Sequence, residues 1–482
     1  MTTTPFRRSP VAVALAAMSI ALAPGFVRGA GFALQEQNAS GLGHAYAGGA
    51  AAAEDVSTIF YNPAGLVRLK SMQFVVAANA ICPSTKFHDS GSSQAAFGQP
   101  LGGTGGDAGS CAGVPNLYFG VPFTDKWSFG IGVNVPFGLK TEYDSDWLGR
   151  FQAVQSKVET YNINPVLSWE PTKNLTVGAG VSYQHLKATL TSQVNYAGAY
   201  ANGVQTAVAA NPALAPFAST LAASAAGLES SGRVTGDDGS WGWNVGVLWQ
   251  ATPETRFGAA YRSHISYTVV GNASFDNPTA VATLPPQLAP TGALILNGVN
   301  AQLYDGSVQL KLRLPDTANV SIFHQFDNKW DLMADVQYTG WSSFKELNVV
   351  RTSGAASGDT LSNPPNTPTP ENFRSTWRVS GGANYRYTDK WTWRGGIAWD
   401  QSPVNNTDRT PRLPDNDRFW LAFGAQYKLN DNWAFDAAYA YIWVRDASIN
   451  QNAGNTAANG LINGTYKANV NIVGLQVTYT AK

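Results

Sequence analysis

The connections between the β-patterned segments of this chain alternate in length, and this alternation is the strongest constraint on its fold. Short connections of tight-turn composition lie at residues 124–127, 171–174, 252–255, 327–330, 388–391 and 430–433. Long connections rich in Gly, Ala, Asn, Pro and Ser lie at about 82–112, 144–152, 192–238, 271–303, 351–371, 403–415 and 451–463. Six short turns and seven long loops separate fourteen strands, which predicts an all-β protein, a transmembrane antiparallel β-barrel of about 14 strands.

Alternation of period two within the strands supports this prediction, because it sorts residues into an apolar face and a polar or small face. Between Trp127 and Lys140 the odd positions are apolar, and residues 433–443 repeat the pattern. A closed barrel also leaves no unsatisfied sheet edge in hydrocarbon. We therefore expect the following side chains to face lipid: Trp127, Phe129, Ile131, Val133, Val135, Phe137 and Leu139.

The same parity places charged side chains in the lumen. A lipid-facing Arg or Lys at mid-depth costs roughly 2–4 kcal/mol, so lumenal charges are expected in any barrel. Two interpretations stay open: ion pairs that hold the lumen and a plug together, or one or two unpaired cations that bind an anionic head group. The predicted lumenal charges are Lys311, Arg313, Asp331, Asp335, Arg378, Arg386, Arg394, Asp400 and Lys428.

The N-terminal residues divide into an export signal and a plug. Residues 1–29 contain Arg7 and Arg8, then an apolar run from Val11 to Leu22 and small residues before the expected cleavage point, which is typical of a signal peptide. Residues 30–70 are too rich in Ala and Gly, and too irregular in period, to form a membrane strand. We expect them to form an N-terminal hatch, or plug, inside the lumen of a barrel built from residues 71–482.

Composition fits an exported membrane protein and excludes several other classes. Charged residues make up 13% of the chain, against ~25% in soluble domains, and the formal net charge of zero gives no sign of a nucleic-acid partner. The five histidines are scattered, so we expect neither a metal nor a cofactor. The two cysteines, Cys82 and Cys111, are candidates for a disulfide that closes one loop.

One predicted strand is interrupted by a proline. Pro136 removes a ladder donor, so it belongs at a bulge or an edge, and Gly138 makes a kink easier. The kink is either a barrel corner or a local gap toward lipid, formed by Asn134, Pro136, Phe137 and Gly138.

The longest loop is predicted to contain two short helices. Its middle, residues 202–228, is rich in Ala, is broken by prolines and has apolar residues at near-helical spacing, among them Leu214, Phe217 and Leu221. The apolar face either packs against neighbouring loops or receives an apolar ligand, and the sequence favours neither interpretation.

The residues resemble the FadL-type long-chain fatty-acid and hydrocarbon transporter family of the Gram-negative outer membrane. The likeness covers essentially the whole mature chain and rests on the order and spacing of short motifs. These are Gly31-Phe32, Ser40-Gly41-Leu42-Gly43-His44-Ala45-Tyr46, Asn62-Pro63-Ala64, Gly242-Trp243-Asn244, Tyr261-Arg262-Ser263, Leu314-Pro315, Ser402-Pro403-Val404 and Pro414-Asp415-Asn416-Asp417-Arg418-Phe419-Trp420.

The resemblance implies passive outer-membrane transport of a hydrophobic small molecule, most simply a long-chain fatty acid. The ligand would settle on a groove between loops 192–238 and 271–303, which includes the three apolar loop residues named above. It would then bind in a lumenal pocket near Ala30, Gly31 and Phe32.

The resemblance also implies how the ligand leaves. A hatch rearrangement involving Asn62, Pro63 and Ala64 would release it sideways into the membrane through the gap at Pro136. We expect this Asn-Pro-Ala motif to brace the hatch against the kinked strand.

The partner of a ligand carboxylate is open. Characterised fatty-acid members place an arginine where this chain has Ser192, which leaves Lys187, Arg378 and Arg394 as candidates. Lys187 has the parity of a lipid-facing residue, so it would reach inward only through a bulge. Relatives that carry toluene or other monoaromatics bind no carboxylate, so uptake of monoaromatic hydrocarbons by the same route is the alternative.

Other functional classes stay as weaker hypotheses. A lipid-modifying enzyme would need a Ser, His and acid constellation, and no Gly-x-Ser-x-Gly elbow occurs. A general porin would need an open lumen, and a structural or adhesive barrel is a further possibility. We expect a monomeric, multi-pass protein that is no enzyme, with outer-membrane lipid, lipopolysaccharide and the barrel-assembly machinery as its other partners.

Overall fold

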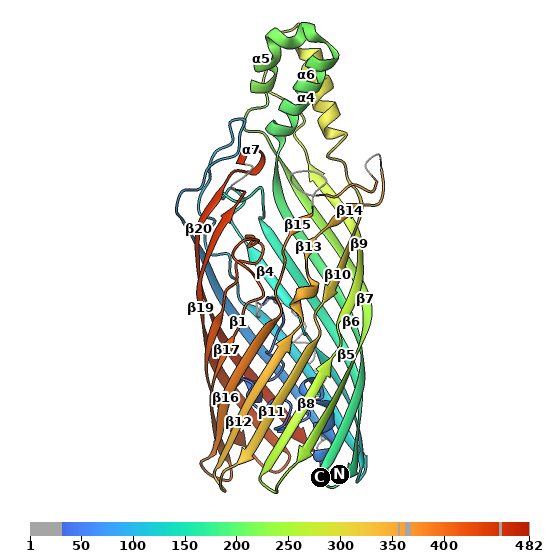
Figure 1. Ribbon diagram of the computed structural model, residues 1–482, viewed down its shortest axis with the longest axis vertical. Helices are drawn as coiled ribbons and strands as arrows, with labels where there is room; N and C mark the ends of the chain where they lie inside the picture. The colour runs from blue at the N-terminus through green and yellow to red at the C-terminus, as the bar shows by residue number, and fades with distance from the viewer. Residues whose placement is uncertain (1–30, 355–356, 362–367, 453–455, 482) are drawn as a thin grey trace, which may run out of the picture.

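A computed structural model describes residues 31–354, 357–361, 368–452 and 456–481. These residues form a tall, closed barrel of 14 antiparallel strands with helices beyond one end (Figure 1). The predicted signal peptide and Ala30 lie outside the described residues. None of the described helices is long and apolar enough to cross a membrane.

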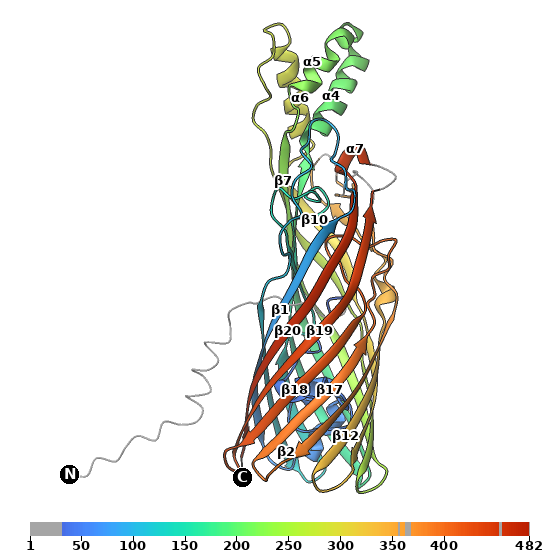
Figure 2. The ribbon, with the colours of Figure 1, turned by 90° about the vertical axis from the view of Figure 1, so that its left-hand side faces the viewer.

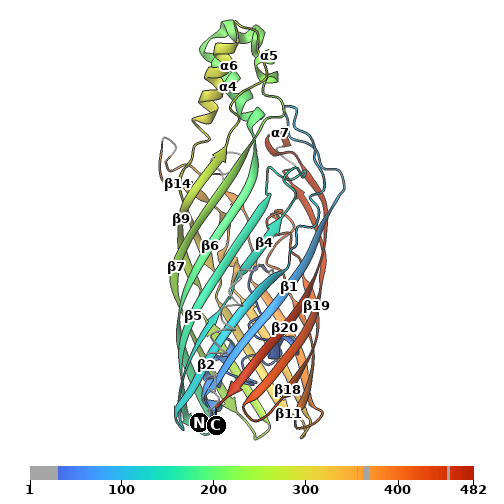
Figure 3. The ribbon, with the colours of Figure 1, turned by 180° about the vertical axis from the view of Figure 1, so that it is seen from behind.

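Eleven of the barrel strands are continuous. They are β1 (Gln73–Asp89), β2 (Ala112–Thr124), β5 (Gln155–Thr172), β6 (Leu175–Asn195), β7 (Glu229–Gln250), β12 (Trp330–Thr339), β16 (Thr376–Arg386), β17 (Trp391–Asp400), β18 (Arg418–Lys428), β19 (Trp433–Gln451) and β20 (Ile462–Thr480). The first and last strands close the barrel, because β1 pairs with β20 along its whole length (Figure 3).

The other three barrel strands are each broken into two segments. They are β3 (Trp127–Asn134) with β4 (Gly138–Glu142), β8 (Thr255–Arg262) with β9 (Ile265–Asp276), and β10 (Gly306–Leu314) with β11 (Thr317–Gln325). A short extra strand, β14 (Val349–Arg351), pairs with β10, and β13 (Glu346–Leu347) pairs with β15 (Thr369–Pro370).

All six predicted short turns join consecutive barrel strands. Several long loops are shorter than predicted, because strands continue into them: β7 begins at Glu229, and β9 ends at Asp276. The loop helices α4 (Tyr196–Ala210), η2 (Pro212–Phe217), α5 (Ala218–Ala223) and α6 (Ala289–Asn300) stand beyond the barrel, with α7 (Thr456–Asn459) below them (Figures 1 and 2). The two predicted helices of the long loop are thus present as α4 and α5.

The hatch, residues 31–70, lies inside the lumen near the short turns (Figure 2). It contains α2 (Ala39–Leu42), α3 (Thr58–Tyr61) and η1 (Pro63–Arg68). A short helix from elsewhere in the chain, η3 (Trp341–Ser343), packs beside the start of the hatch. Its backbone is held by wall side chains: Arg256 donates to the carbonyls of Ala51 and Ala52 at 3.1 and 2.6 Å, and Arg378 donates to that of Ala45 at 2.7 Å.

Glycines in the wall make room for the hatch. A Cβ at Gly246 would lie 1.9 Å from the side-chain oxygen of Asn62, and one at Gly258 would lie 1.9 Å from the carbonyl oxygen of Ala50. The hatch also crosses the closing strands: Asn79 of β1 donates to the Glu36 carbonyl at 2.8 Å, and the Ala39 amide donates to Gln476 of β20 at 3.1 Å.

The three strand breaks reverse which face of the strand points inward. The inward residues that flank the breaks are Asn134 and Phe137, Arg262 and Ile265, and Leu314 and Thr317, three positions apart in each case. An odd step exchanges the two faces of a strand. We call the barrel on the short-turn side of these breaks the hatch half, and the barrel beyond them the loop half.

This reversal overturns two sets of sequence predictions. Phe137 and Leu139 are buried in the lumen and do not face lipid. Lys311 and Arg313 are exposed on the outer face, while Leu310, Leu312 and Leu314, which alternate with them, point inward. The prediction failed because it assumed that the same alternate positions face inward on both sides of a strand break.

Candidate functional site

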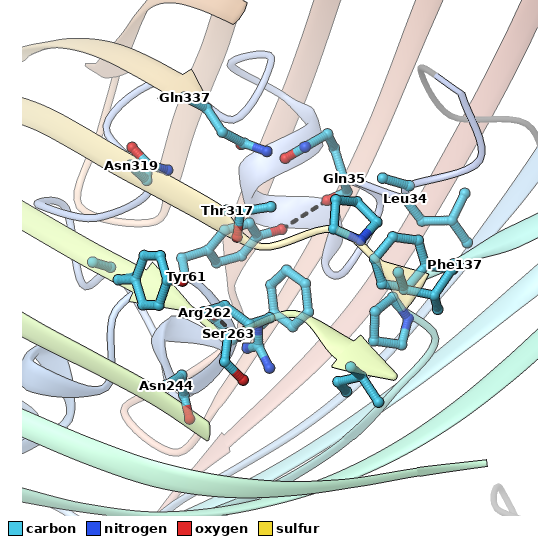
Figure 4. A pocket seen from close by; sticks show the side chains of 18 of the residues that line it. Leu34, Gln35, Tyr61, Phe137, Asn244, Arg262, Ser263, Thr317, Asn319 and Gln337 are labelled. Carbon is cyan, nitrogen blue, oxygen red and sulfur yellow. Dashed lines mark hydrogen bonds between the residues drawn. The ribbon is translucent and has the colours of Figure 1, made fainter. Parts of the chain in front are cut away.

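A cavity lies where the start of the hatch meets the three strand breaks. Figure 4 shows Leu34 and Phe137 on one side of it and Asn244, Arg262 and Ser263 on another. The hydroxyl of Tyr61 donates to the Gln35 carbonyl at 2.9 Å and so ties two hatch segments together beside the cavity. The cavity is mainly apolar, with further lining from Ala33, Phe60, Pro63, Pro136, Ile265, Leu314 and Pro315.

Phe32 closes the top of the hatch with aromatic contacts. Its ring centroid lies 4.7 Å from that of Trp341, 6.1 Å from that of Phe137 and 6.4 Å from that of Phe344. The preceding residue, Gly31, has φ +64° and donates its amide to Asp415 at 3.0 Å. A Cβ at Gly31 would lie 2.9 Å from both Trp341 and Pro403, so the start of the hatch is held tightly.

The kinked strand is bonded to the start of the hatch. Leu34 donates its amide to the Pro136 carbonyl at 2.8 Å, and Gly138 donates to the Phe32 carbonyl at 2.9 Å. The side chain of Gln37 donates to the Val135 carbonyl at 3.0 Å. The structure therefore brings the predicted pocket residues Gly31 and Phe32 together with the predicted opening.

The wall ladder stops at this kink. The β2–β3 pairing ends at Leu117 and Val133, and β4 is paired to β5. Among the described residues, 112–116 of β2 have no ladder partner on the β4 side. Asn134, the last residue of β3, instead accepts a hydrogen bond from the side chain of Asn162 at 3.0 Å. We call this interruption the Pro136 gap.

The Asn62-Pro63-Ala64 motif lies elsewhere, which corrects the expectation that it braces the kinked strand. The side chain of Asn62 donates to the Val247 carbonyl of β7 at 3.0 Å and to the Ala50 carbonyl at 2.6 Å. A Cβ at Gly178 of β6 would lie 2.4 Å from Pro63. The motif therefore seats the hatch on β6 and β7, and Pro63 also borders the cavity.

The three candidate cations occupy different environments. Arg378 is buried in the lumen, and its Nε atom has no hydrogen-bond partner among the described residues. Arg394 is paired with Asp436 and with Glu54 of the hatch, so it holds the hatch, and it does not line the cavity. Lys187 lies on the outer face of β6, as its parity indicated. Its prediction as a lumenal ligand residue is therefore wrong.

A second, smaller pocket adjoins the main cavity at Arg378. It is lined by Ala33, Gln35, Gln337, Thr339, Trp341, Thr376, Arg378, Asp400 and Trp420. Ala33, Gln35 and Gln337 border both pockets, so the apolar cavity continues into a polar end.

Two hatch glutamates differ in their charge partners. Burial alone would raise the pKa of Glu54, but Arg394 and His44 outweigh burial and hold that pKa well below its usual range. Glu36 is fully buried, and neither carboxylate oxygen has a hydrogen-bond partner within the described part of the chain. Burial raises the pKa of Glu36 to about 7, against the opposing charges of Arg418 and Arg378.

The lumen above the cavity is apolar. Its buried cluster joins the Phe32 region to the loop half and consists of Phe32, Phe137, Leu139, Leu186, Ile265, Tyr267, Val269, Leu310, Leu312, Leu314, Trp341, Phe373, Val404 and Leu413. Sequence reasoning missed most of these residues. Pro315, which follows Leu314 directly, was the available signal for the break that turns β10 inward.

The two longest loops pack on each other. Leu221 is buried with Tyr196 and Val204 of α4 and Ile295 of α6, whereas Leu214 is half-buried and Phe217 is 41% exposed. Tyr196 donates its hydroxyl to Asn300 at 2.7 Å. The helices therefore use most of their apolar face on one another.

Neither a metal cluster nor a thiol site accompanies the cavity. In the described ranges no three His, Cys, Asp or Glu side chains are grouped as a metal would require. A disulfide joins Cys82 to Cys111, and Cys82 lies within β1 instead of in a loop. The site therefore offers shape, apolar surface and a few fixed charges.

Comparison with known proteins shows which family has this architecture. Residues 20–481 match the family described as "Outer membrane protein transport protein (OMPP1/FadL/TodX)". The long-chain fatty acid transport protein of Escherichia coli K12 is 31% identical over 452 residues, covering 92% of this chain and 94% of its own. Outer membrane protein P1 of Haemophilus influenzae is 30% identical, covering 97% and 98%.

Solved structures agree on the fold. A Pseudomonas aeruginosa FadL homologue has a TM-score of 0.77 and 26% identity, with 93% of this chain and 99% of that chain covered. The toluene transporter TbuX of Ralstonia pickettii shares the fold at a TM-score of 0.59 and 21% identity, with 92% and 99% covered.

Proposed function

The chain belongs to the OMPP1/FadL/TodX family of outer-membrane transport proteins, and from this premise we propose that it carries long-chain fatty acids through an occluded barrel and releases them sideways into the membrane. The protein is an outer-membrane transporter of hydrophobic molecules. The choice of fatty acids follows from curated relatives at about 30% identity that bear that name.

One observation carries the proposal: an apolar lumen leads from the loop half to a cavity that borders the Pro136 gap. A long acyl chain in a water-filled pore would forgo ~0.8 kcal/mol per CH₂ relative to burial. Apolar side chains along the lumen remove this cost, and a sideways exit delivers the chain to the bilayer without contact with water.

The polar end of the cavity suits a head group. We assign the ligand carboxylate to the small pocket at Arg378, where the Nε atom is without a hydrogen-bond partner in the described residues. The acyl chain then lies in the apolar part, against Leu34 and Phe137.

The same contacts suggest how ligand and hatch are coupled. Phe32 fills the aromatic cage above the cavity, and its carbonyl accepts the hydrogen bond from Gly138 at the kink. A ligand that displaces Phe32 weakens this bond, so ligand binding loosens the hatch at the Pro136 gap. The seat at Asn62 on β7 then serves as the fixed end of the moving segment.

Uptake of a labelled long-chain fatty acid tests the proposal. Cells that lack the protein should lose uptake, and wild-type protein should restore it while leakage of hydrophilic solutes stays unchanged. Gly138→Trp should lower uptake without lowering expression. Gly395→Trp is the matched control, because a Cβ at Gly395 of β17 would meet no atom within 4 Å. Normal uptake by the Gly138→Trp variant would refute an exit at the Pro136 gap.

Monoaromatic hydrocarbons are the second candidate substrate. Asp400 and the buried Glu36 place negative charge near Arg378, which an uncharged ligand tolerates better than a carboxylate does. Uptake of a labelled alkylbenzene, with no uptake of fatty acid, would decide for this candidate. Mass spectrometry of the ligand that co-purifies in mild detergent provides an independent answer.

A further inference from the structure

The barrel wall has a second interruption, across the cavity from the Pro136 gap. Strand β7 pairs with β9 up to Asp237 and Val270, and with β8 from Asn244 and Arg262 onward. Between these points the two strands are not paired in the described chain. Residues 238–243 of β7 have no ladder partners among residues 263–269 of the next strand. We call this stretch the β7–β9 seam.

The seam is held at its ends by hydrogen bonds, one of which runs from the Ser263 amide to the Trp243 carbonyl at 2.9 Å. Ser263 accepts a hydrogen bond from the Trp243 amide at 2.9 Å, and Asp238 accepts one from the Thr268 amide at 2.7 Å. Backbone groups that lack partners cost several kcal/mol in hydrocarbon, and they are tolerated at membrane depth where they line a cavity or are buried in protein.

The breaks in the neighbouring strands coincide with the seam. The residues between β8 and β9, 263–264, lie opposite those between β10 and β11, 315–316, because Arg262 pairs with Thr317 and Ile265 pairs with Leu314. Pro315 removes a backbone donor at this level. Two adjacent strands therefore bend together beside the seam.

Side chains on both faces of the wall cover the seam. On the inner side, a Cβ at Gly242 would lie 2.9 Å from Ile265, so the Ile265 side chain lies over Gly242. On the outer side, a Cβ at Gly239 would lie 2.0 Å from the Tyr183 hydroxyl, and the Tyr183 and Trp241 rings are 5.1 Å apart. Trp241 is 68% exposed, as expected for an aromatic residue at the lipid interface.

The cavity reaches this part of the wall. Its lining includes the inward-facing Ile265 and also Val245 and Tyr261, which belong to the outer face of β7 and β8. The Pro136 gap borders the same cavity through Pro136 and Phe137. One ligand chamber thus adjoins two interruptions of the wall.

We propose that the β7–β9 seam is a second lateral exit, through which the acyl chain of a bound ligand passes from the cavity into the membrane when Ile265 moves away from Gly242. This inference rests on the proposed function. It gives Ile265 the role of the closing side chain, with Tyr183 and Trp241 as the outer cover.

Closing the two openings separately tests the second exit. The G242C/I265C pair closes the seam under oxidising conditions, and Gly138→Trp closes the Pro136 gap. D237C/V270C is the matched control, because these residues already face each other in the ladder. We expect each closure alone to lower fatty-acid uptake in part, both together to lower it to the level of cells without the protein, and reductant to restore the seam's share.

Two transport results would overturn the second exit. One is that Gly138→Trp alone abolishes uptake, and the other is that the oxidised G242C/I265C protein transports like D237C/V270C in both backgrounds. Heat-modifiable migration of each variant in detergent gels verifies that the barrel has folded.

A labelling experiment decides the question even if fatty acids prove not to be transported. Purified protein in phospholipid vesicles is irradiated with a palmitic-acid analogue that carries a terminal diazirine, and labelled peptides are mapped. Label on residues 239–242 and Ile265 that disappears in oxidised G242C/I265C, while label on lipid-facing Trp249 persists, supports the exit. Label that reaches the Pro136 gap and leaves the seam unmodified refutes it.

Discussion

The hatch half and the loop half of the barrel differ most clearly on the three broken strands, where the inward and outward faces are exchanged. In the hatch half, apolar side chains such as Trp393 and Ile397 point outward, and the lumen contains glycines and hydrogen-bonding groups that hold the hatch. In the loop half, Lys311 and Arg313 point outward, and leucines that alternate with them line the lumen. The difference teaches that three breaks of the strand register suffice to turn a membrane-facing surface into a ligand-facing one.

Two buried glutamates report the same contrast. In the hatch, Arg394 and His44 overcome the effect of burial and hold the pKa of Glu54 well below its usual range. Near the apolar lumen of the loop half, burial raises the pKa of Glu371 to about 8, although Arg412 opposes the shift. Glu54 thus keeps its charge beside paired cations, whereas the pKa of Glu371, like that of the hatch residue Glu36, is raised by burial.

Removing a charge from the hatch half should have the largest effect. Arg394→Ala removes the guanidinium that is paired with Asp436 and Glu54, and removal of one partner from a typical buried ion pair costs about 3–5 kcal/mol. We expect a loosened hatch and increased leakage of hydrophilic antibiotics, measured as sensitivity of intact cells. The control is Arg313→Ala on the outer face; equal leakage from both variants would contradict the assigned role.

Adding polarity to the loop half should have an intermediate effect. Leu312→Asn places an amide in the apolar lumen, and an unpaired amide costs roughly 1–3 kcal/mol in such a site. We expect fatty-acid uptake to fall by about tenfold or more, since 1.4 kcal/mol corresponds to a factor of ten. The adjacent outward change Lys311→Asn should leave uptake unchanged, and a similar loss in both variants would remove the distinction between the faces.

Removing the titratable group at Glu371 should have the smallest effect, confined to one loop. Because the folded-state pKa lies above the unfolded value, the loop is most stable below the unfolded pKa and loses stability as pH rises toward about 8. Hydrogen exchange of residues 369–375, corrected for intrinsic rates, should speed up over this range in the wild type. Glu371→Gln should remove the dependence, while the exposed Glu346→Gln should retain it.

Strand number and turn positions could be predicted from the sequence because they depend on local signals. The tight turns before Trp127, Trp330, Trp391 and Trp433 and the period-two runs between them specify a closed barrel without knowledge of tertiary contacts. The breaks could not be placed in this way. Pro136 was recognisable, but the parity change at residues 263–264 and 315–316 depends on how two neighbouring strands bend together.

The candidate site was predictable in part. Phe32 and the Pro136 region were predicted from the sequence, and the structure places them in contact, but Ala33, Leu34 and Gln35 line the cavity instead of Gly31 and Phe32. The distinction between Arg378 and Arg394 was out of reach, because it depends on Glu54 and Asp436, which come from distant parts of the chain. The Asn62 motif was assigned to the wrong wall for the same reason: its seat is a glycine on β7.

The position of the hatch across the closing strands has a consequence for biogenesis. The hatch precedes β1 in the chain, yet Gln476, which accepts the Ala39 amide, belongs to β20, the last strand to be synthesised. Asn79 of β1 supplies the other half of this seat. The docking surface for the hatch is therefore complete only when β1 and β20 meet. Binding of the hatch and closure of the barrel then form one cooperative step, and an unclosed intermediate has no bound hatch.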